Sequence, residues 1–156
     1  MKLLLLILCY AWNISINSNI EYRHLAWSDF KVKAVSDYTA AETVTEIGYN
    51  FDGSNVTVFC KFNKGESFVI KKAMTPYILN HEQRHFDITY IFAMKLVREL
   101  KKEQSLTEKG IEAVYDRVYL EKEVMQELYD GETKHSENKQ KQSDWDNKID
   151  KMLTNL

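Results

Sequence analysis

The stretch that decides the fold runs from Thr75 to Lys102 and reads TPYILNHEQRHFDITYIFAMKLVRELKK. Thr75 is a natural N-cap residue, and Pro76 takes the first helical position, where its missing N–H costs nothing. No glycine and no further proline interrupts the residues that follow. We therefore expect one long helix that ends at about Lys102.

Two further helices are expected after this one. Residues 105–108 form a capping-box pattern that begins the second helix, and Asp130-Gly131 is expected to end it. The third helix is expected over residues 138–153. Apolar residues at helical spacing, which we interpret as core, are Ile111, Val114, Val118 and Met125 in the second helix and Trp145, Ile149 and Met152 in the third.

The region before the long helix has the pattern of short strands. Residues 42–49 and 56–62 alternate apolar and polar side chains, and Asp52-Gly53 between them is a strong hairpin signal. A third apolar run covers residues 67–70. These runs predict an N-terminal antiparallel β-meander packed against the helices, which makes the chain a small α+β domain.

The composition is that of one folded domain. The chain has 156 residues, of which 44% are hydrophobic and 28% charged, with one proline and five glycines. These values exclude a disordered tail, a collagen-like repeat and a disulfide-dense scaffold. The formal net charge of -2 leaves no excess positive charge for a phosphate backbone, so we expect no nucleic-acid partner.

The N-terminus has the pattern of a secretory signal peptide. A lysine precedes an apolar run over residues 3–12, which is too short to span a bilayer, since that takes about 20 residues. A signal anchor and a buried strand are the alternatives. We expect residues 1–19 to be the signal peptide, with cleavage between Ser15 and Ile20, and residues 20–156 to be a single domain. The processed protein is then secreted or periplasmic and not integral to a membrane.

Removal of the signal peptide leaves Cys60 as the only cysteine. The processed chain then has no internal disulfide, so its core, a metal or assembly must stabilise it. Cys60 lies in a strand-like run and is expected to behave as a small buried hydrophobe.

The long helix contains an H-E-x-x-H motif, His81-Glu82-Gln83-Arg84-His85. Histidines four residues apart project from the same side of a helix, so both imidazoles can reach one ion at about 2.0–2.1 Å. The glutamate between them can contact a metal-bound water without binding the metal. The motif predicts His81 and His85 as Zn²⁺ ligands and Glu82 as a general base. The alternative is a pair of buried core histidines.

A zinc hydrolase needs a third protein ligand and a fourth position open to water. The metzincin extension is absent, because Ile91 stands where its third histidine would be. His135, in the turn expected between the second and third helices, is the favoured third ligand. Glu132 is the next choice and Asp130 a further carboxylate alternative, whereas His24 lies just after the expected signal peptide and is not favoured.

Residues 81–88, HEQRHFDI, resemble the H-E-Q-x-H-F-D-I signature of a bacterial domain-of-unknown-function family described as predicted secreted zinc-dependent proteases. Ser136 departs from the pattern, because the family tends to carry glycine there. The resemblance implies a zincin-like fold and a bound zinc ion rather than any particular substrate. The resemblance extends over about residues 25–149 through shorter similar pieces. These pieces are Trp27-Ser28-Asp29-Phe30, Cys60-Lys61-Phe62, Tyr129-Asp130, Thr133, His135 and Trp145.

Three other side chains are candidates for supporting roles. Asp87 could orient a ligand histidine, because metal-bound imidazoles usually donate their other N–H; an exposed helix charge is the alternative. Glu132 is a second candidate for such support. Tyr129 could donate a hydrogen bond to the oxyanion of a tetrahedral intermediate, and a packed core tyrosine is the alternative.

These features together predict a secreted zinc metallopeptidase that acts on a peptide or protein. In that mechanism Glu82 takes a proton from the zinc-activated water and returns it to the leaving amine. The alternative is an exported, non-catalytic binding or assembly module whose zinc site is structural or vestigial.

Overall fold

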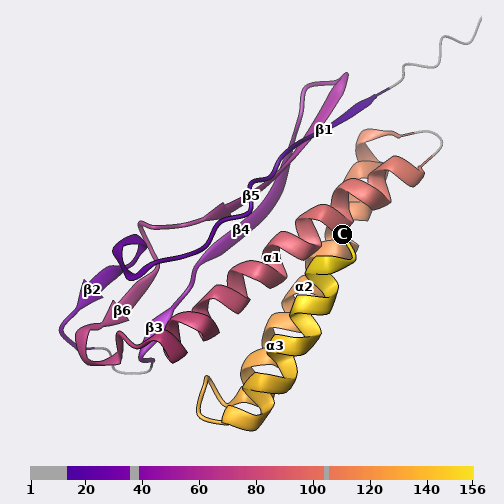
Figure 1. Cartoon of the computed structure of the whole chain (residues 1–156). Coiled ribbons are helices and arrows are strands. Elements are labelled where there is room, and N and C mark those ends of the chain that lie inside the picture. Colours follow the sequence, from indigo (N-terminus) through magenta and orange to yellow (C-terminus); the bar gives the residue numbers. More distant parts are fainter. Residues whose placement is uncertain (1–13, 36–38, 104–105) are drawn as a thin grey trace, which may run out of the picture.

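The computed structural model describes residues 14–35, 39–103 and 106–156. The fold is α+β, because two small β-sheets come first in the chain and three helices follow (Figure 1). In the described part, none of the helices has the length and apolar character that a membrane span requires.

The first sheet has β5 (Asn55–Phe62) between β1 (Ser15–Asn19) and β4 (Thr45–Phe51). β4 and β5 form the expected antiparallel hairpin. At its turn the Asp52 carboxylate accepts hydrogen bonds from two backbone N–H groups, and Gly53 has a φ of 90°, which favours glycine. β1 pairs with β5 in parallel.

The second sheet has β6 (Phe68–Ile70) between β2 (Lys31–Lys33), which is parallel to it, and β3 (Ala41–Glu42), which is antiparallel. The predicted three-strand meander is therefore wrong in its third strand, because β6 pairs with neither strand of the hairpin. The physical reason is a tight turn in which the Asn63 carbonyl accepts the Ser67 N–H at 2.9 Å and leads the chain away from β5.

The expected signal peptide overlaps the first sheet. Residues 1–13 lie outside the described residues. Residues 15–19 form β1, whose register with β5 runs from Ser15 opposite Asn55 to Asn19 opposite Phe59. A cut between Ser15 and Ile20 would therefore remove part or all of a paired strand.

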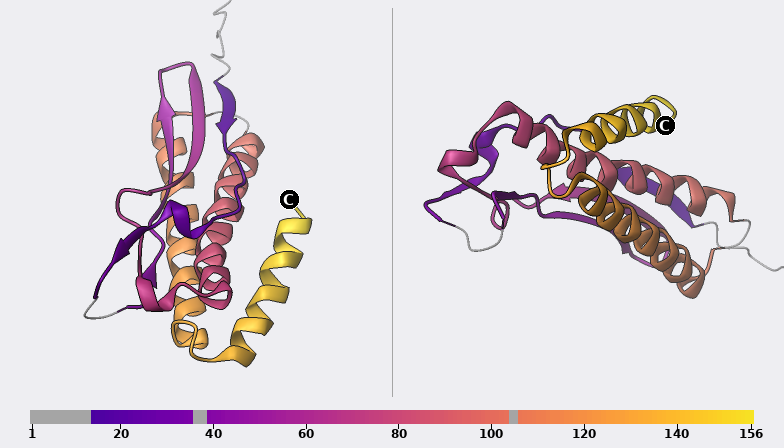
Figure 2. Two further views of the ribbon diagram at one scale, coloured as in Figure 1. Left: turned by 60° about the vertical axis from the view of Figure 1, so that its left-hand side comes forward. Right: turned by 90° about the horizontal axis from the view of Figure 1, so that it is seen from below.

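The three helices are α1 (Pro76–Lys102), α2 (Glu108–Thr133) and α3 (Lys139–Thr154). α1 begins and ends where the sequence predicts, with the Thr75 hydroxyl accepting the Ile78 N–H. α3 packs against α1 and α2, on the side away from the first sheet (Figure 2). Short 3-10 turns cover Trp27–Asp29 and Lys71–Ala73.

The prediction that α2 ends at Asp130-Gly131 is wrong, because the helix continues through both residues to Thr133. A glycine inside a helix costs only about 1 kcal/mol, and the packing of α2 against α1 outweighs it. The helix ends instead where Lys134 adopts a left-handed conformation with a φ of 51°.

One apolar core lies between the first sheet and the helices, and the predicted stripes of α2 and α3 are buried in it, apart from the half-buried Met152. Cys60 is half-buried between this core and a smaller cluster around Phe30 and Phe86. Burial raises the pKa of the Cys60 thiol to about 12. Cys60 is thus half-buried rather than buried as expected, and its raised pKa keeps the thiol protonated.

Candidate metal site

The two histidines of the H-E-x-x-H motif lie together on the side of α1 that faces α2. His81 is buried, and the side chain of His85 is 13% exposed. Their rings meet edge to face, with centroids 4.9 Å apart and Nε2 atoms 3.3 Å apart. The helical spacing thus brings two imidazole nitrogens to one point.

α2 supplies a third group at this point. Asp130 Oδ1 lies 3.2 Å from His81 Nε2 and 3.1 Å from His85 Nε2. The three ligand atoms all lie within 4.8 Å of one another, so the group could hold a metal ion. Asp130, the carboxylate alternative of the sequence analysis, thus takes the third place in the group.

His135, the favoured third ligand, is not part of this group. Its side chain is 70% exposed, and its Nδ1 lies 3.5 Å from Asp130 Oδ1. The reason is the extra length of α2, which keeps Asp130 on the helix and directs it toward α1. His135 then falls in a run of three left-handed residues, Lys134 to Ser136, with φ values of 51°, 50° and 74°.

Buried polar atoms without hydrogen bonds lie close to the group of His81, His85 and Asp130. Among the described residues, three buried side-chain oxygens have no assigned hydrogen bond: Thr43 Oγ1, Glu82 Oε2 and Asp130 Oδ1, the last of which lies at ion-pair distance from the two imidazole nitrogens. All three residues line one groove with His81 and His85. A buried, unpartnered polar atom costs about 1–3 kcal/mol, and more when it is charged, so these oxygens indicate a site that is completed by a ligand.

The groove is open to solvent and has a volume of about 1050 Å³. One wall is the segment of residues 39–45, which contains β3, and the remainder is formed by α1, by α2 and by residues 134–137 of the turn after α2, which include His135. β3 is an edge strand of the second sheet in the described part of the chain. An extended backbone therefore lies along one side of the candidate site.

The second ring nitrogen of each histidine meets a glutamine. His81 Nδ1 lies 2.9 Å from Gln142 Oε1 of α3, and His85 Nδ1 lies 2.6 Å from Gln126 Oε1 of α2. The sequence analysis missed both glutamines. The only available signal was the position of Gln126 four residues before Asp130, which puts the two side chains on one face of α2.

The charges in the group depend on one another. Burial alone would raise the pKa of Asp130, but the imidazoles of His81 and His85 hold it well below its usual value. Burial opposes protonation of His85, yet Asp130 and Glu82 raise the pKa of its imidazole above the ordinary value. The arrangement therefore favours positive charge between the histidines and the carboxylate.

Tyr129 lies beneath the histidines rather than in the groove. It is fully buried, its ring stacks on His81 with centroids 4.8 Å apart, and its hydroxyl donates to the His81 carbonyl at 3.2 Å. Burial raises the pKa of this hydroxyl far above its usual value. A hydroxyl held here does not reach an oxyanion in the groove, so the position fits the packed-tyrosine alternative.

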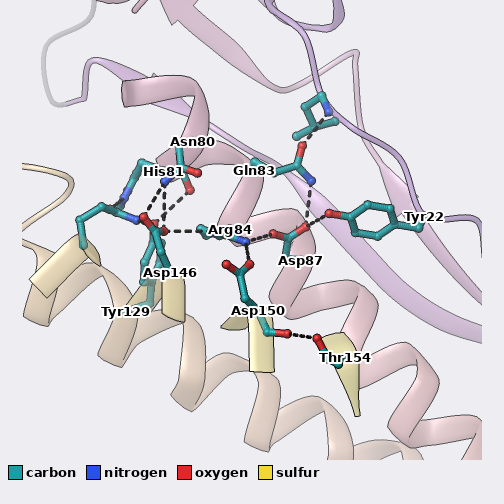
Figure 3. A network of polar contacts seen from close by, with 12 residues as sticks. Tyr22, Asn80, His81, Gln83, Arg84, Asp87, Tyr129, Asp146, Asp150 and Thr154 are labelled. Carbon is teal, nitrogen blue, oxygen red and sulfur yellow. Dashed lines mark hydrogen bonds and ion pairs between the residues drawn. The ribbon is translucent and has the colours of Figure 1, made fainter. Parts of the chain in front are cut away.

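The other two expected supporting residues lie outside the ligand group. Asp87 is buried and accepts hydrogen bonds from Tyr22 at 3.0 Å and Arg84 at 3.0 Å (Figure 3). Burial raises its pKa even against these donors. Glu132 accepts the Trp145 indole N–H at 2.9 Å and so joins α2 to α3. Neither carboxylate contacts a histidine of the motif.

Comparisons of this chain with models of known protein families, with curated proteins and with solved structures found no match.

Proposed function

We propose that this protein is a secreted zinc-dependent hydrolase that cleaves peptides. The observation that carries the proposal is the groove in which two imidazole nitrogens and a carboxylate oxygen converge. The same groove contains all the unpartnered buried side-chain oxygens of the described residues. A pair of ordinary core histidines would leave no such oxygens beside them.

The donor set supports zinc as the ion. His81, His85 and Asp130 would hold it, and two imidazoles with one carboxylate is a set that catalytic zinc sites use, with a fourth position open to water. Ligand atoms of a tetrahedral site with bonds of about 2.0–2.1 Å are about 3.3–3.4 Å apart. The three separations here are 3.1, 3.2 and 3.3 Å, close to that spacing. When bound, zinc supplies Lewis-acid activation of water and of a carbonyl.

Glu82 supplies the proton transfer in this proposal. Its carboxylate is buried, lines the groove beside the ligand group, and has an oxygen without a hydrogen-bond partner. That free oxygen can accept a proton from the attacking water and return it to the leaving amine. Hydrolysis requires such a base next to the fourth, open coordination position of the zinc ion, whereas a purely structural metal site does not require a base.

The shape of the groove supports a peptide or protein as the substrate. An extended peptide can pair its backbone with an edge strand, and β3 runs along the groove wall. Ala41 and Glu42 use one edge to pair with β6, and no strand of the described residues pairs with the other edge of β3, which can therefore accept a second strand.

The proposal includes export of the protein, and the apolar run over residues 3–12 supports it. Because β1 begins at Ser15 and belongs to the first sheet, we place the end of the leader before that residue. The processed enzyme would then retain all of the described strands.

The test combines a metal assay with a cleavage assay. Protein purified without chelators should carry about one zinc per chain by elemental analysis and should cleave members of a broad peptide library. Glu82→Gln should retain the zinc and lower hydrolysis by about 10²–10⁴-fold, because only the base is lost. Glu112→Gln, an exposed change on α2 away from the groove, is the matched control.

Two outcomes contradict the proposal. Full hydrolysis by Glu82→Gln would show that Glu82 is not the base. A zinc-bound protein that cleaves no peptide, and that unfolds when zinc is removed, would instead identify a structural site in a non-catalytic module.

A further inference from the structure

A neutral imidazole carries one N–H and one lone pair, and the hydrogen bonds of the ring decide which nitrogen has the proton. In this site each Nδ1 faces a glutamine side chain, which has an oxygen that accepts and an NH₂ group that donates. The contact with a glutamine therefore does not by itself assign the tautomer. The remaining partners of each amide do so.

The orientation of Gln142 follows from a chain of groups that have only one role. Arg84 only donates, and its Nε lies 3.0 Å from Asp146 Oδ1 (Figure 3). The Asp146 carboxylate only accepts, and the Gln142 amide lies 2.9 Å from the same oxygen. The group of Gln142 that faces Asp146 must therefore be the NH₂. Its oxygen then faces His81, so His81 Nδ1 carries the proton and donates it.

The orientation of Gln126 follows from a backbone carbonyl. The Gln126 NH₂ lies 2.9 Å from the carbonyl oxygen of His85, which can only accept, and 3.2 Å from the Thr89 hydroxyl. The reverse orientation would place two carbonyl oxygens against each other. The Gln126 oxygen therefore faces His85 Nδ1 at 2.6 Å, and this nitrogen also carries the proton.

Both Nε2 atoms are then left with bare lone pairs, 3.3 Å apart and beside Asp130 Oδ1. Three electron-pair donors that face one point repel each other unless a cation lies between them. A histidine pair that only filled the core would place one Nε2–H toward the other nitrogen. In neutral rings the two glutamines exclude an Nε2–H, because each glutamine oxygen holds the single ring proton on Nδ1.

We infer that Gln126 and Gln142 are positioning residues, which hold His85 and His81 in the Nδ1–H tautomer and so present both Nε2 lone pairs to a metal ion. The identity of that ion rests on the proposed function. The tautomer itself is a property of the metal-free protein. α3 is thereby part of the site, since Gln142 and its partner Asp146 both belong to it.

The first test reads the tautomer directly. Long-range ¹H–¹⁵N correlation spectra of the metal-free full chain, at alkaline pH where imidazoles are neutral, distinguish a protonated Nδ1 from a protonated Nε2. We expect Nδ1–H at both His81 and His85. A protonated Nε2 on either ring would overturn the inference. A protein that binds no zinc would refute the proposed function, while these spectra would still decide the tautomer.

The second test separates positioning from packing. Gln126→Met removes the oxygen that accepts from His85, and zinc affinity should fall about 10–100-fold. Gln126→Glu keeps an oxygen that accepts from His85 but loses the NH₂ that donates to the His85 carbonyl, so it should lose less affinity than Gln126→Met. Gln140→Met, at an exposed position of α3, is the control and should leave the affinity unchanged. Equal losses in the Met and Glu variants at position 126 would refute the role.

Discussion

The sequence analysis favours His135 as the third metal ligand, whereas the structure favours Asp130. A comparison of the zinc affinities of Asp130→Asn and His135→Ala decides between the two residues. Asp130 Oδ1 lies 3.1 Å from His85 Nε2 and 3.2 Å from His81 Nε2, so its charge is part of the proposed metal site. Loss of an outer partner of a metal ligand costs about 10–100-fold in affinity. We expect Asp130→Asn to cost more than 100-fold in zinc affinity, which is about 2.7 kcal/mol or more.

The expected effect of His135→Ala is much smaller. Its imidazole is 70% exposed and lies 3.5 Å from Asp130 Oδ1, outside the ligand group. An exposed ionic contact contributes about 0–1 kcal/mol, which corresponds to at most about a fivefold change in affinity. His24→Ala, at an exposed position away from the groove, is the control and should leave the affinity unchanged.

The assay is competition for zinc against a chromophoric chelator, with the thermal unfolding of each metal-free variant as a check on its fold. The expected order of affinity loss is Asp130→Asn far above His135→Ala. The reverse order, with His135→Ala losing the metal and Asp130→Asn retaining it, would refute the ligand set derived from the structure.

Two further predictions concern the stability of the α2–α3 turn and the reactivity of the thiol. Ser136 has a φ of 74°, which costs a residue other than glycine about 1–2 kcal/mol, and the greater freedom of glycine in the unfolded chain offsets about 0.4–1 kcal/mol of this. Ser136→Gly should therefore raise the free energy of unfolding by up to about 1.5 kcal/mol in urea titrations, and a loss of stability would contradict the strain. With a thiol pKa of about 12, the thiolate fraction of Cys60 at pH 8 is about 10⁻⁴, against about 0.2 for a free cysteine. Iodoacetamide should therefore alkylate Cys60 about 10³-fold more slowly in native Cys9→Ser protein than in the same protein in urea, and equal rates would show that the thiol is accessible and unperturbed.

Local patterns in the sequence determined much of the fold. The cap at Thr75 begins α1, and the absence of helix breakers lets the helix run to Lys102, because both effects act within a few residues. The spacing of four residues between His81 and His85 places both rings on one side of the helix for the same reason. The Asp-Gly turn predicts the β4–β5 hairpin, because its backbone conformation is a property of the turn itself.

Contacts between distant segments decided the rest. β6 joins β2 and β3 through pairings that no local pattern specifies, and β1 adds a strand where a signal peptide was expected. The packing of α2 on α1 carries the helix past Gly131 and brings Asp130 to the histidines, whereas the turn signal alone predicted an earlier end and favoured His135. The two glutamines lie 41 and 61 residues from the histidines that they contact. Only the packing of the three helices brings these side chains together, because side chains that far apart in the chain meet through tertiary contacts and not through helical spacing.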